Sequence, residues 1–348
     1  MKKEKVNVLM TCCGGDLAPE YIMAMKNSVR YDITVLAVDG NANAVGKNFA
    51  DYFSVVPMGQ ADNYIDTILG LVRQYQIDLI IAGSDGEALS LSFNKVVFAK
   101  EGCVVACPST DVLSQLSNKL TTYKVLKNAG ISCADFMEAS TAEELQKSTE
   151  DMYDRHSEIV IKPAVSRGGR NVFVIRRDIK GEQSYHGGRE THCSWDVFQT
   201  KYQKQIADLF PVVVMQRLFE PTYDIDVLGW EGNPINVIPR LRHNPAGIPF
   251  EGNTISMNAE LVNLGKSVCK AFNLSWLLDI DVMCTSDERP VVLEVNPRMS
   301  GSCPASVIAG VPLFDNIVAL SRGEEPLLVE PKEGTVIVGY KALKRETV

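Results

Sequence analysis

Four short apolar segments constrain the fold of the N-terminal part most, because each ends at or just before glycine, aspartate or proline. The segments are VNVLMTCC, ITVLAVD, IDLIIAG and CVVACP. Between them, a helix is expected to open at Pro19, and residues 64–75 have a helical pattern. Strands that alternate with helices in this way predict an α/β domain with a doubly wound parallel sheet.

In sheets of this kind, ligands bind outside the C-terminal ends of the strands. The residues that follow those ends are therefore candidates for lining a cleft, and they are Gly14, Gly15, Asp16, Asp39, Ser84, Asp85 and Glu87. The acids among them hint at a positively charged group on a substrate, although acids at such positions also cap helices. A dinucleotide site is disfavoured, because CCGGDLAPE lacks the second and third glycines of the G-x-G-x-x-G fingerprint. Asp39 alone is weak evidence for a ribose contact.

The composition argues against several classes of protein. The chain has 348 residues, a hydrophobic content of 45% and a formal net charge of −8 without a Lys/Arg run, so nucleic acid is not expected as a partner. No apolar run approaches the roughly 20 residues that span a bilayer, and the start MKKEKVNVLM is expected to be a first strand rather than a signal peptide. Nine cysteines without a CxxC pair predict reduced thiols and a cytoplasmic location.

Hard oxygen donors gather near the C-terminal end, in LDIDVMCTSDERPVVLEVNPRMSGS. Glu294 and Asn296 are two residues apart on a predicted strand, so their side chains point to the same face. The segment TSDERP predicts a hairpin turn that would bring Asp281 beside Glu294. Such oxygen donors suit Mg²⁺ bound together with nucleotide phosphates, with Mn²⁺ as an alternative, and the guanidinium of Arg298 suits phosphoryl oxygens.

A lysine lies inside the apolar run EIVIKPA. The charge of Lys162 would be costly there unless it meets an anion. Six residues later, Gly168 and Gly169 follow Ser166 in SRGGR, and glycines let backbone N–H groups approach phosphates. A plain hairpin with the lysine reaching the surface is the alternative. The acidic motif downstream favours the phosphate site.

Two further segments are less specific. Residues 110–129 have the pattern of one helix that closes with Gly130, and residues 177–196 are polar and contain glycine, which predicts a long loop. His186, His192 and Cys193 lie in that segment without the spacing of a zinc site, so a solvated loop or a lid over substrate is expected.

Taken together, these segments resemble the ATP-grasp superfamily, closest to its carbamoyl-phosphate-synthase-like branch of carboxylate–amine ligases. The resemblance covers nearly the whole chain and rests on GSDGE, SNKLTTYKVLKNAGI, KPAVSRGG, VVVMQRLFEPTYDIDV and LEVNPRMSGS. It implies an α/β fold, in which a doubly wound parallel-sheet domain is followed by a two-lobed α+β ATP-grasp domain. A Rossmann-like domain at 1–110 would precede a small lobe with the glycine loop at 111–213 and a catalytic lobe at 214–348.

The resemblance also implies roles for individual positions. The ATP-binding residues would be Lys119, Lys162, Ser166, Gly168, Gly169, Gln216, Arg217, Leu218 and Glu220. Asp281, Glu294 and Asn296 match the Mg²⁺ ligands, and Arg298 matches the arginine near the transferred phosphoryl group. Among Arg240, Arg242 and His243 in RLRH, the family-like position favours Arg240 for binding a substrate carboxylate or the acyl phosphate, with a basic surface turn as the alternative. Specificity is expected to depend on Gly15, Asp16, Asp85, Glu87 and His243.

The hinge segment departs from the family pattern. Gln216 stands where a glutamate is usual, and Phe219-Glu220-Pro221-Thr222 replaces Pro-Gly-Glu-Glu. Thr222 therefore takes the place of the ribose-binding acid, and Glu220 is the nearest carboxylate. This leaves the ribose contact in doubt.

The implied activity is an ATP-dependent ligase that joins a small-molecule carboxylate to an amine, of the amino acid or modified sugar class. The reaction would pass through an acyl phosphate and release ADP and phosphate. One alternative is a carboxyphosphate-forming carboxylase or a carbamoyl-phosphate-type enzyme, and another is a non-catalytic nucleotide-binding regulatory protein. Relatives are often dimers, so a homodimer stays open, although no interface patch is legible in the sequence.

Overall fold

The computed structural model describes residues 3–166, 171–185, 190–244 and 250–344. The chain forms two compact units. The first unit contains residues 1–113, 223–280 and 296–348, and the second contains residues 114–222 and 281–295. The predicted division of the chain into three contiguous domains, with boundaries after residues 110 and 213, stays a prediction.

The first unit begins with a five-stranded parallel sheet in the order β3-β2-β1-β4-β5. Its strands are β1 (Glu4–Met10), β2 (Tyr31–Asp39), β3 (Tyr52–Val55), β4 (Leu79–Ile81) and β5 (Val104–Ala106). The connecting helices are α1 (Ala18–Lys26), η1 (Val45–Asn48), α2 (Tyr64–Tyr75), α3 (Asp85–Phe93), α4 (Lys95–Ala99) and α5 (Thr110–Leu116). The four predicted strands and the doubly wound parallel sheet are confirmed, and the short edge strand β3 was missed.

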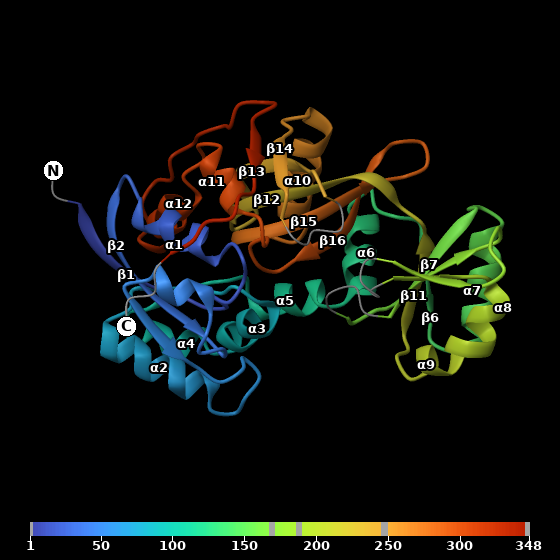
Figure 1. The fold of residues 1–348 in the computed structure, drawn as a ribbon, viewed down its shortest axis with the longest axis horizontal. Coiled ribbons are helices and arrows are strands. Elements are labelled where there is room, and N and C mark those ends of the chain that lie inside the picture. Colours follow the sequence, from blue (N-terminus) through green and yellow to red (C-terminus); the bar gives the residue numbers. More distant parts are fainter. Residues whose placement is uncertain (1–2, 167–170, 186–189, 245–249, 345–348) are drawn as a thin grey trace. The chain divides into compact units, whose positions relative to one another are not determined.

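Alternation along β1 explains why helices cover both faces of this sheet. Val8 and Met10 belong to the same buried cluster as Ile22 of α1, whereas Leu9 belongs to the cluster that contains Ile68 of α2. Figure 1 shows α1 and α2 on opposite sides of β1. Because both faces are buried, the strands are continuous apolar runs rather than alternating ones.

The second unit contains a six-stranded sheet in the order β6-β11-β7-β8-β10-β9. Its strands are β6 (Phe136–Ala139), β7 (Glu158–Pro163), β8 (Val172–Arg176), β9 (Glu182–Tyr185), β10 (Glu190–Cys193) and β11 (Val212–Gln216). Its helical segments are α6 (Lys119–Asn128), α7 (Ala142–Tyr153), α8 (Trp195–Val197), η3 (Phe198–Tyr202) and α9 (Gln203–Ala207). Neighbouring strands are antiparallel except for the parallel pair β8–β10.

A second six-stranded sheet follows, in the order β16-β15-β12-β13-β14-β17. Its strands are β12 (Phe219–Trp230), β13 (Asn233–Arg242), β14 (Gly252–Ile255), β15 (Trp276–Cys284), β16 (Pro290–Asn296) and β17 (Val336–Val338). The helices are α10 (Ala259–Ala271), α11 (Pro304–Ile308) and α12 (Leu313–Ser321). The backbone N–H of Thr285 donates to the carbonyl of Arg289, which confirms the predicted hairpin turn between β15 and β16.

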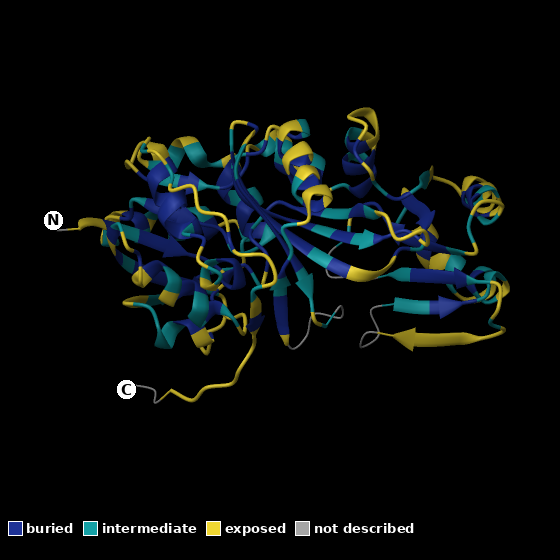
Figure 2. Ribbon diagram, turned by 90° about the horizontal axis from the view of Figure 1, so that it is seen from above, coloured by how far each residue is buried: buried dark blue, intermediate teal, exposed yellow. Residues whose placement is uncertain are grey.

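Two predictions of local structure were wrong. The segment 177–196 is not a long loop, because it contains β9 and β10. These strands pair with each other, and Figure 2 shows the exposed strand β9 in yellow at the edge of its sheet. The single helix predicted over residues 110–129 is two helices. The side chain of Asn118 accepts hydrogen bonds from the N–H groups of Leu120 and Thr121, and thereby starts α6 anew.

Within the part of the chain that the structure describes, no helix is both long and apolar enough to cross a membrane.

Candidate nucleotide and metal site

Two lysines of the second unit are placed by the start of α6 and by β7. Lys119 is the first residue of α6, and its backbone N–H donates to the carbonyl of Ala164, just beyond β7. Its ammonium lies 3.0 Å from a carboxylate oxygen of Glu294 and 2.9 Å from the carbonyl of Ser166. Lys162 occupies β7 opposite Val213 of β11, with only 6% of its surface exposed. The fold therefore brings both predicted nucleotide lysines into one unit.

The surroundings of Lys162 are unusual for an ammonium group. Among the described residues, its single hydrogen-bond partner is the hydroxyl of Tyr123, at 3.1 Å. The ammonium also lies 5.5 Å from the centre of the Tyr123 ring. Burial lowers the pKa of Lys162 below its ordinary value, while the charges of Glu294, Asp281 and Glu190 oppose that shift. A buried ammonium with one neutral partner is well suited to bind an anion.

Two of the three predicted metal ligands belong to this unit. Glu294 contacts Lys119, and both Glu294 and Asp281 act electrostatically on Lys162. The hairpin that carries them is fixed within the unit, because the N–H of Val292 donates to the carbonyl of Ser132. Cations and carboxylates therefore lie close together, as expected where phosphate oxygens and Mg²⁺ bind side by side.

The third metal candidate, Asn296, lies in the first unit. Its side-chain nitrogen donates to Asp279 at 3.0 Å. This contact fixes the orientation of the amide and directs its oxygen, the end that can coordinate a cation, away from Asp279. Two carboxylates and one amide oxygen are the hard donors that Mg²⁺ prefers, so the residues present fit the ion.

The hinge candidates follow β11. Gln216 and Leu218 are buried, and backbone N–H groups of Gln216 and Arg217 donate to carbonyls of Asp135 and Glu158. The guanidinium of Arg217 lies 3.0 Å from Glu190 of β10. Glu220 is exposed, whereas Thr222, at the position of the ribose acid, is 4% exposed. The structure therefore does not put a buried acid in that place.

The glycine loop is described only in part. Ser166 is half-buried, and its carbonyl accepts the hydrogen bond from Lys119. Gly168 and Gly169 lie outside the described residues, as does His186. His192 and Cys193 are buried in β10, and no group of three or more potential metal-binding side chains among the described residues includes either of them.

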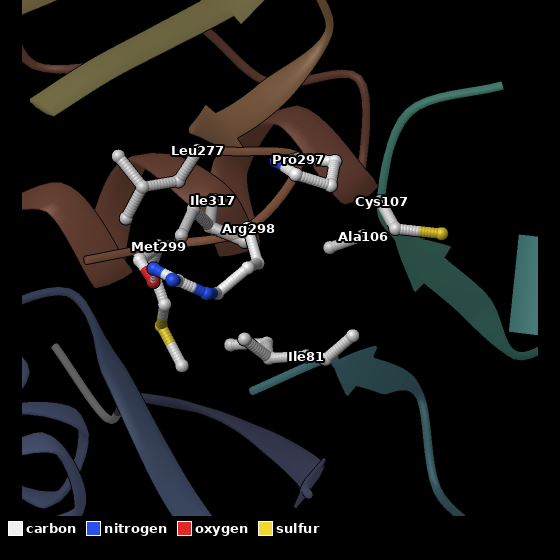
Figure 3. A pocket seen from close by; sticks show the side chains of 9 residues that line it. Ile81, Ala106, Cys107, Leu277, Pro297, Arg298, Met299 and Ile317 are labelled. Atoms are coloured by element: carbon white, nitrogen blue, oxygen red, sulfur yellow. Dashed lines mark hydrogen bonds between the residues drawn. The ribbon is translucent and has the colours of Figure 1, made fainter. Parts of the chain in front are cut away.

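Arg298 lies between two carboxylates of the first unit. It is 3.4 Å from Asp85 and 3.8 Å from Asp279. Arg298 also lines a cavity of about 10 Å³, room for about one water molecule, together with Ile81, Leu277 and Met299 (Figure 3). Asp85 was predicted to line the cleft because it follows β4. It lies beside Arg298, the predicted phosphoryl-binding arginine.

Arg240 is the most deeply buried of the predicted cationic residues, with 0% of its surface exposed. Each of its five N–H groups has an acceptor. Two go to the carboxylate of Asp226 at 2.9 and 3.1 Å, and the others to Asn253, to Ser302 at 2.8 Å and to Ser300 at 2.7 Å. In this structure Arg240 therefore fixes the segment that follows Arg298, and its donors are committed to the protein. A direct substrate contact by Arg240 stays an untested prediction.

The remaining substrate candidates fall into two groups. Glu87 is buried, and the hydroxyls of Thr11 and Ser84 donate to it, while Ser84 caps α3 by accepting from the N–H of Glu87. Burial raises the pKa of Glu87. Asp39 accepts from the N–H of Gly14 at 2.7 Å, which gives it a role in shaping the turn after β1.

Gly15, Asp16 and His243 are exposed, and His243 contacts the hydroxyl of Thr254 at 2.8 Å. The roles of these three residues in substrate binding stay predictions.

Three important residues escaped sequence reasoning. Tyr123, Asp226 and Asp279 are all buried next to predicted site residues. The signal for the two acids was present, because each lies inside an apolar strand (YDIDVLGW and WLLDIDV), where an unpaired charge is costly. Tyr123 lies four residues after Lys119 and thus on the same face of its helix.

Two family models match separate parts of the chain. Residues 208–342 match the family model described as ATP-grasp in the biosynthetic pathway with Ter operon, and residues 8–106 match the PylC-like N-terminal domain. These two matches confirm the predicted resemblance to the ATP-grasp superfamily. Its mixed architecture, a parallel N-terminal sheet followed by largely antiparallel sheets, confirms the predicted fold class.

Two curated relatives share about a quarter of their aligned residues with this chain. The L-arginine-specific L-amino acid ligase of Bacillus subtilis is 24% identical over 292 residues, which is 79% of this chain and 65% of that protein. The formate-dependent phosphoribosylglycinamide formyltransferase of Trichormus variabilis is 25% identical over 179 residues, which is 51% of this chain and 42% of that protein. The alignments thus span less than two thirds of these relatives.

Solved structures share the fold at low sequence identity. The N5-carboxyaminoimidazole synthetase of Staphylococcus aureus in complex with ADP has a TM-score of 0.68 at 14% identity, covering 97% of this chain and 81% of that one. The biotin carboxylase domain of the Hydrogenobacter thermophilus 2-oxoglutarate carboxylase, with MgADP and bicarbonate, has a TM-score of 0.69 at 15% identity, covering 93% and 71%. The L-amino acid ligase of Bacillus licheniformis has a TM-score of 0.62 at 14% identity, covering 94% and 76%.

Proposed function

We propose that the protein is an ATP-dependent carboxylate–amine ligase that acts on small molecules through an acyl phosphate. The observation that carries the proposal is the buried ammonium of Lys162, which has one neutral hydrogen-bond partner among the described residues. A phosphate oxygen would supply the missing negative charge. Similarity to two L-amino acid ligases supports an amino acid as one substrate.

The phosphate-binding role follows from the arrangement of charge. Lys119 and Lys162 place two positive charges in one unit with Glu294 and Asp281. Those carboxylates and Asn296 would hold Mg²⁺, which would supply positive charge to offset that of the phosphates. The two lysines would add fixed positive charge of the chain's own. The chain contributes positioning and fixed charge rather than a covalent nucleophile.

The proposed reaction has two steps. In the first, a carboxylate oxygen of one substrate attacks the γ-phosphorus of ATP, and the bond to the β-phosphate oxygen breaks, which yields an acyl phosphate and ADP. In the second, an amine nitrogen attacks the acyl carbon, the bond from that carbon to the phosphate oxygen breaks, and phosphate leaves. The nitrogen loses a proton and an amide remains. Arg298 is the proposed residue for the transferred phosphoryl group.

A second candidate reaction uses bicarbonate as the first carboxylate. Two structural neighbours support it, since one is a biotin carboxylase domain in complex with bicarbonate and the other is a carboxyaminoimidazole synthetase. The chemistry of the first step would be the same and would give carboxyphosphate. The two candidates therefore differ in the acceptor pocket rather than in the nucleotide site.

ADP and phosphate release from MgATP distinguishes these candidates. Pooled carboxylic acids are added alone, then with pooled amino acids and other amines, and bicarbonate is tested separately. Release that requires both pools, with a product whose mass equals their sum less water, is the result expected for a ligase. Release with bicarbonate alone would favour the second candidate, and absence of release despite MgATP binding would contradict both.

The variant Lys162→Ala tests the nucleotide assignment in the same assay. It should abolish ATP turnover while the protein stays folded, as judged by circular dichroism. Lys147→Ala is the matched control, because Lys147 is an exposed lysine on α7 of the same unit. Turnover that survives in Lys162→Ala would overturn the assignment.

A further inference from the structure

We propose that Tyr123 is a positioning residue, whose hydroxyl fixes the ammonium of Lys162 against strand β16 for nucleotide binding. The inference rests on the proposed function, because it assigns Lys162 to the phosphates of ATP. It adds a residue that neither the sequence motifs nor the family comparison identify.

The hydroxyl of Tyr123 makes two short hydrogen bonds, besides a longer contact of 3.7 Å with the sulfur of Met215. It donates to the backbone carbonyl of Leu293 at 2.6 Å, and it accepts from the ammonium of Lys162 at 3.1 Å. One proton and one lone pair are thus used in opposite directions, so the hydroxyl links β7 to β16 through its own oxygen. Leu293 directly precedes Glu294, the metal candidate that contacts Lys119.

The ring of Tyr123 is immobilised by its surroundings. The residue is 1% exposed, and its ring centre lies 5.1 Å from that of Phe136. Burial raises the pKa of the hydroxyl well above its ordinary value, so the group stays a neutral donor. A rigid, neutral group that accepts from a buried ammonium orients the charge without cancelling it, which leaves the charge available for an anion.

Simple packing is the competing explanation for a buried tyrosine. It predicts that removal of the hydroxyl affects stability alone, because the ring would still fill the same space. Positioning predicts a loss of nucleotide affinity that depends on the presence of Lys162. The two explanations therefore differ in a double-mutant cycle.

The test is calorimetric titration of the full chain with MgATP, in the absence of other substrates. Tyr123→Phe should raise the Kd about tenfold, because the lost hydrogen bond involves a charged group. Tyr64→Phe is the matched control, since Tyr64 is 0% exposed and its hydroxyl has no hydrogen-bond partner among the described residues. Its Kd should stay within about twofold of that of the wild type.

The cycle is completed with Lys162→Met and the double variant, titrated with MgATP to millimolar concentrations. In the Lys162→Met background, Tyr123→Phe should change the Kd by less than about twofold. An equal increase in both backgrounds, or no increase in either, would overturn the positioning role. A wild-type protein that fails to bind MgATP would instead refute the proposed function itself, and the two failures are thereby distinguished.

Discussion

Replacement of Arg240 by methionine tests whether the buried polar network around it holds the first unit together. The substitution keeps much of the side-chain volume but removes five hydrogen bonds, two of them to the carboxylate of Asp226. Asp226 is 0% exposed, and of its side-chain hydrogen-bond partners among the described residues it would keep only the hydroxyl of Ser306, at 2.5 Å. The carboxylate would become a buried charge without a cation.

The size of the effect follows from that arrangement. Removing one partner of a buried ion pair costs about 3–5 kcal/mol, whereas replacing both partners by apolar residues is often close to neutral. Arg242→Met provides the comparison. Arg242 contacts Asp224 and has 24% of its side chain exposed, and Asp224 would retain Arg240 nearby at 3.6 Å. That variant should lose about 1–2 kcal/mol.

Urea unfolding followed by tryptophan fluorescence measures the loss. Trp230 and Trp276 pack edge to face in the first unit, so a Trp195→Phe background leaves reporters in this unit alone. The double variant Asp226→Leu/Arg240→Met should be destabilised by less than the sum of its single variants. A loss below about 1 kcal/mol in Arg240→Met, together with a raised KM for the carboxylate substrate, would refute the structural role and favour direct substrate binding.

Three further predictions concern the nucleotide site, the substrate site and the parallel sheet. Because burial lowers the pKa of Lys162, its charge is lost as the pH rises through a value below the ordinary 10.4 or so, and MgATP affinity should fall there in binding titrations. Lys162→Arg should remove that pH dependence, and an unchanged profile would contradict the assignment. Asp85→Asn should raise the KM of the amine substrate, and an unchanged KM would reject the substrate role. Gly83→Ala should destabilise the protein by about 1–3 kcal/mol in urea, because the added Cβ would clash with the backbone carbonyl oxygen of Thr11 and lie 2.9 Å from the Cβ of Cys12. Gly70→Ala, with open space in the middle of α2, should instead stabilise it by about 0.5–1 kcal/mol, and equal effects of the two substitutions would contradict this account.

Sequence patterns that extend over a few neighbouring residues predicted most of the helices and strands named in the sequence analysis. The four apolar strands of the parallel sheet, the helix from Tyr64 to Tyr75 and the β15–β16 hairpin follow from runs of apolar residues and turn signals that lie close together in the chain. The edge strand β9 and its neighbour β10 were missed because most of their residues are polar, and β9 is exposed along its whole length. An exposed edge strand such as β9 gains little from burial, so its pairing with β10 defines it and the sequence carries no apolar signal.

Side-chain partnerships were harder to predict. The position of Lys119 and Lys162 in the site followed from motifs, but the commitment of Arg240 to Asp226 depends on the register between β12 and β13. That register is a property of the assembled sheet, since a shift by one residue turns every side chain to the other face. Glu87 similarly occupies a typical ligand-binding position, yet Thr11, which lies far from it in the sequence, donates to its carboxylate.

The spacing between Lys119 and Tyr123 has a consequence for how α6 can vary. Four residues on a helix bring these side chains to one face, where one contacts Glu294 and the other contacts Lys162. Insertion of one residue between them would rotate Tyr123 by about 100° around the helix axis and move it by about 1.5 Å along it. The hydroxyl would then leave Lys162 even though every residue of the motif remained. Chain length within this turn is therefore as strictly constrained as residue identity, and insertions and deletions between Lys119 and Tyr123 should not be tolerated.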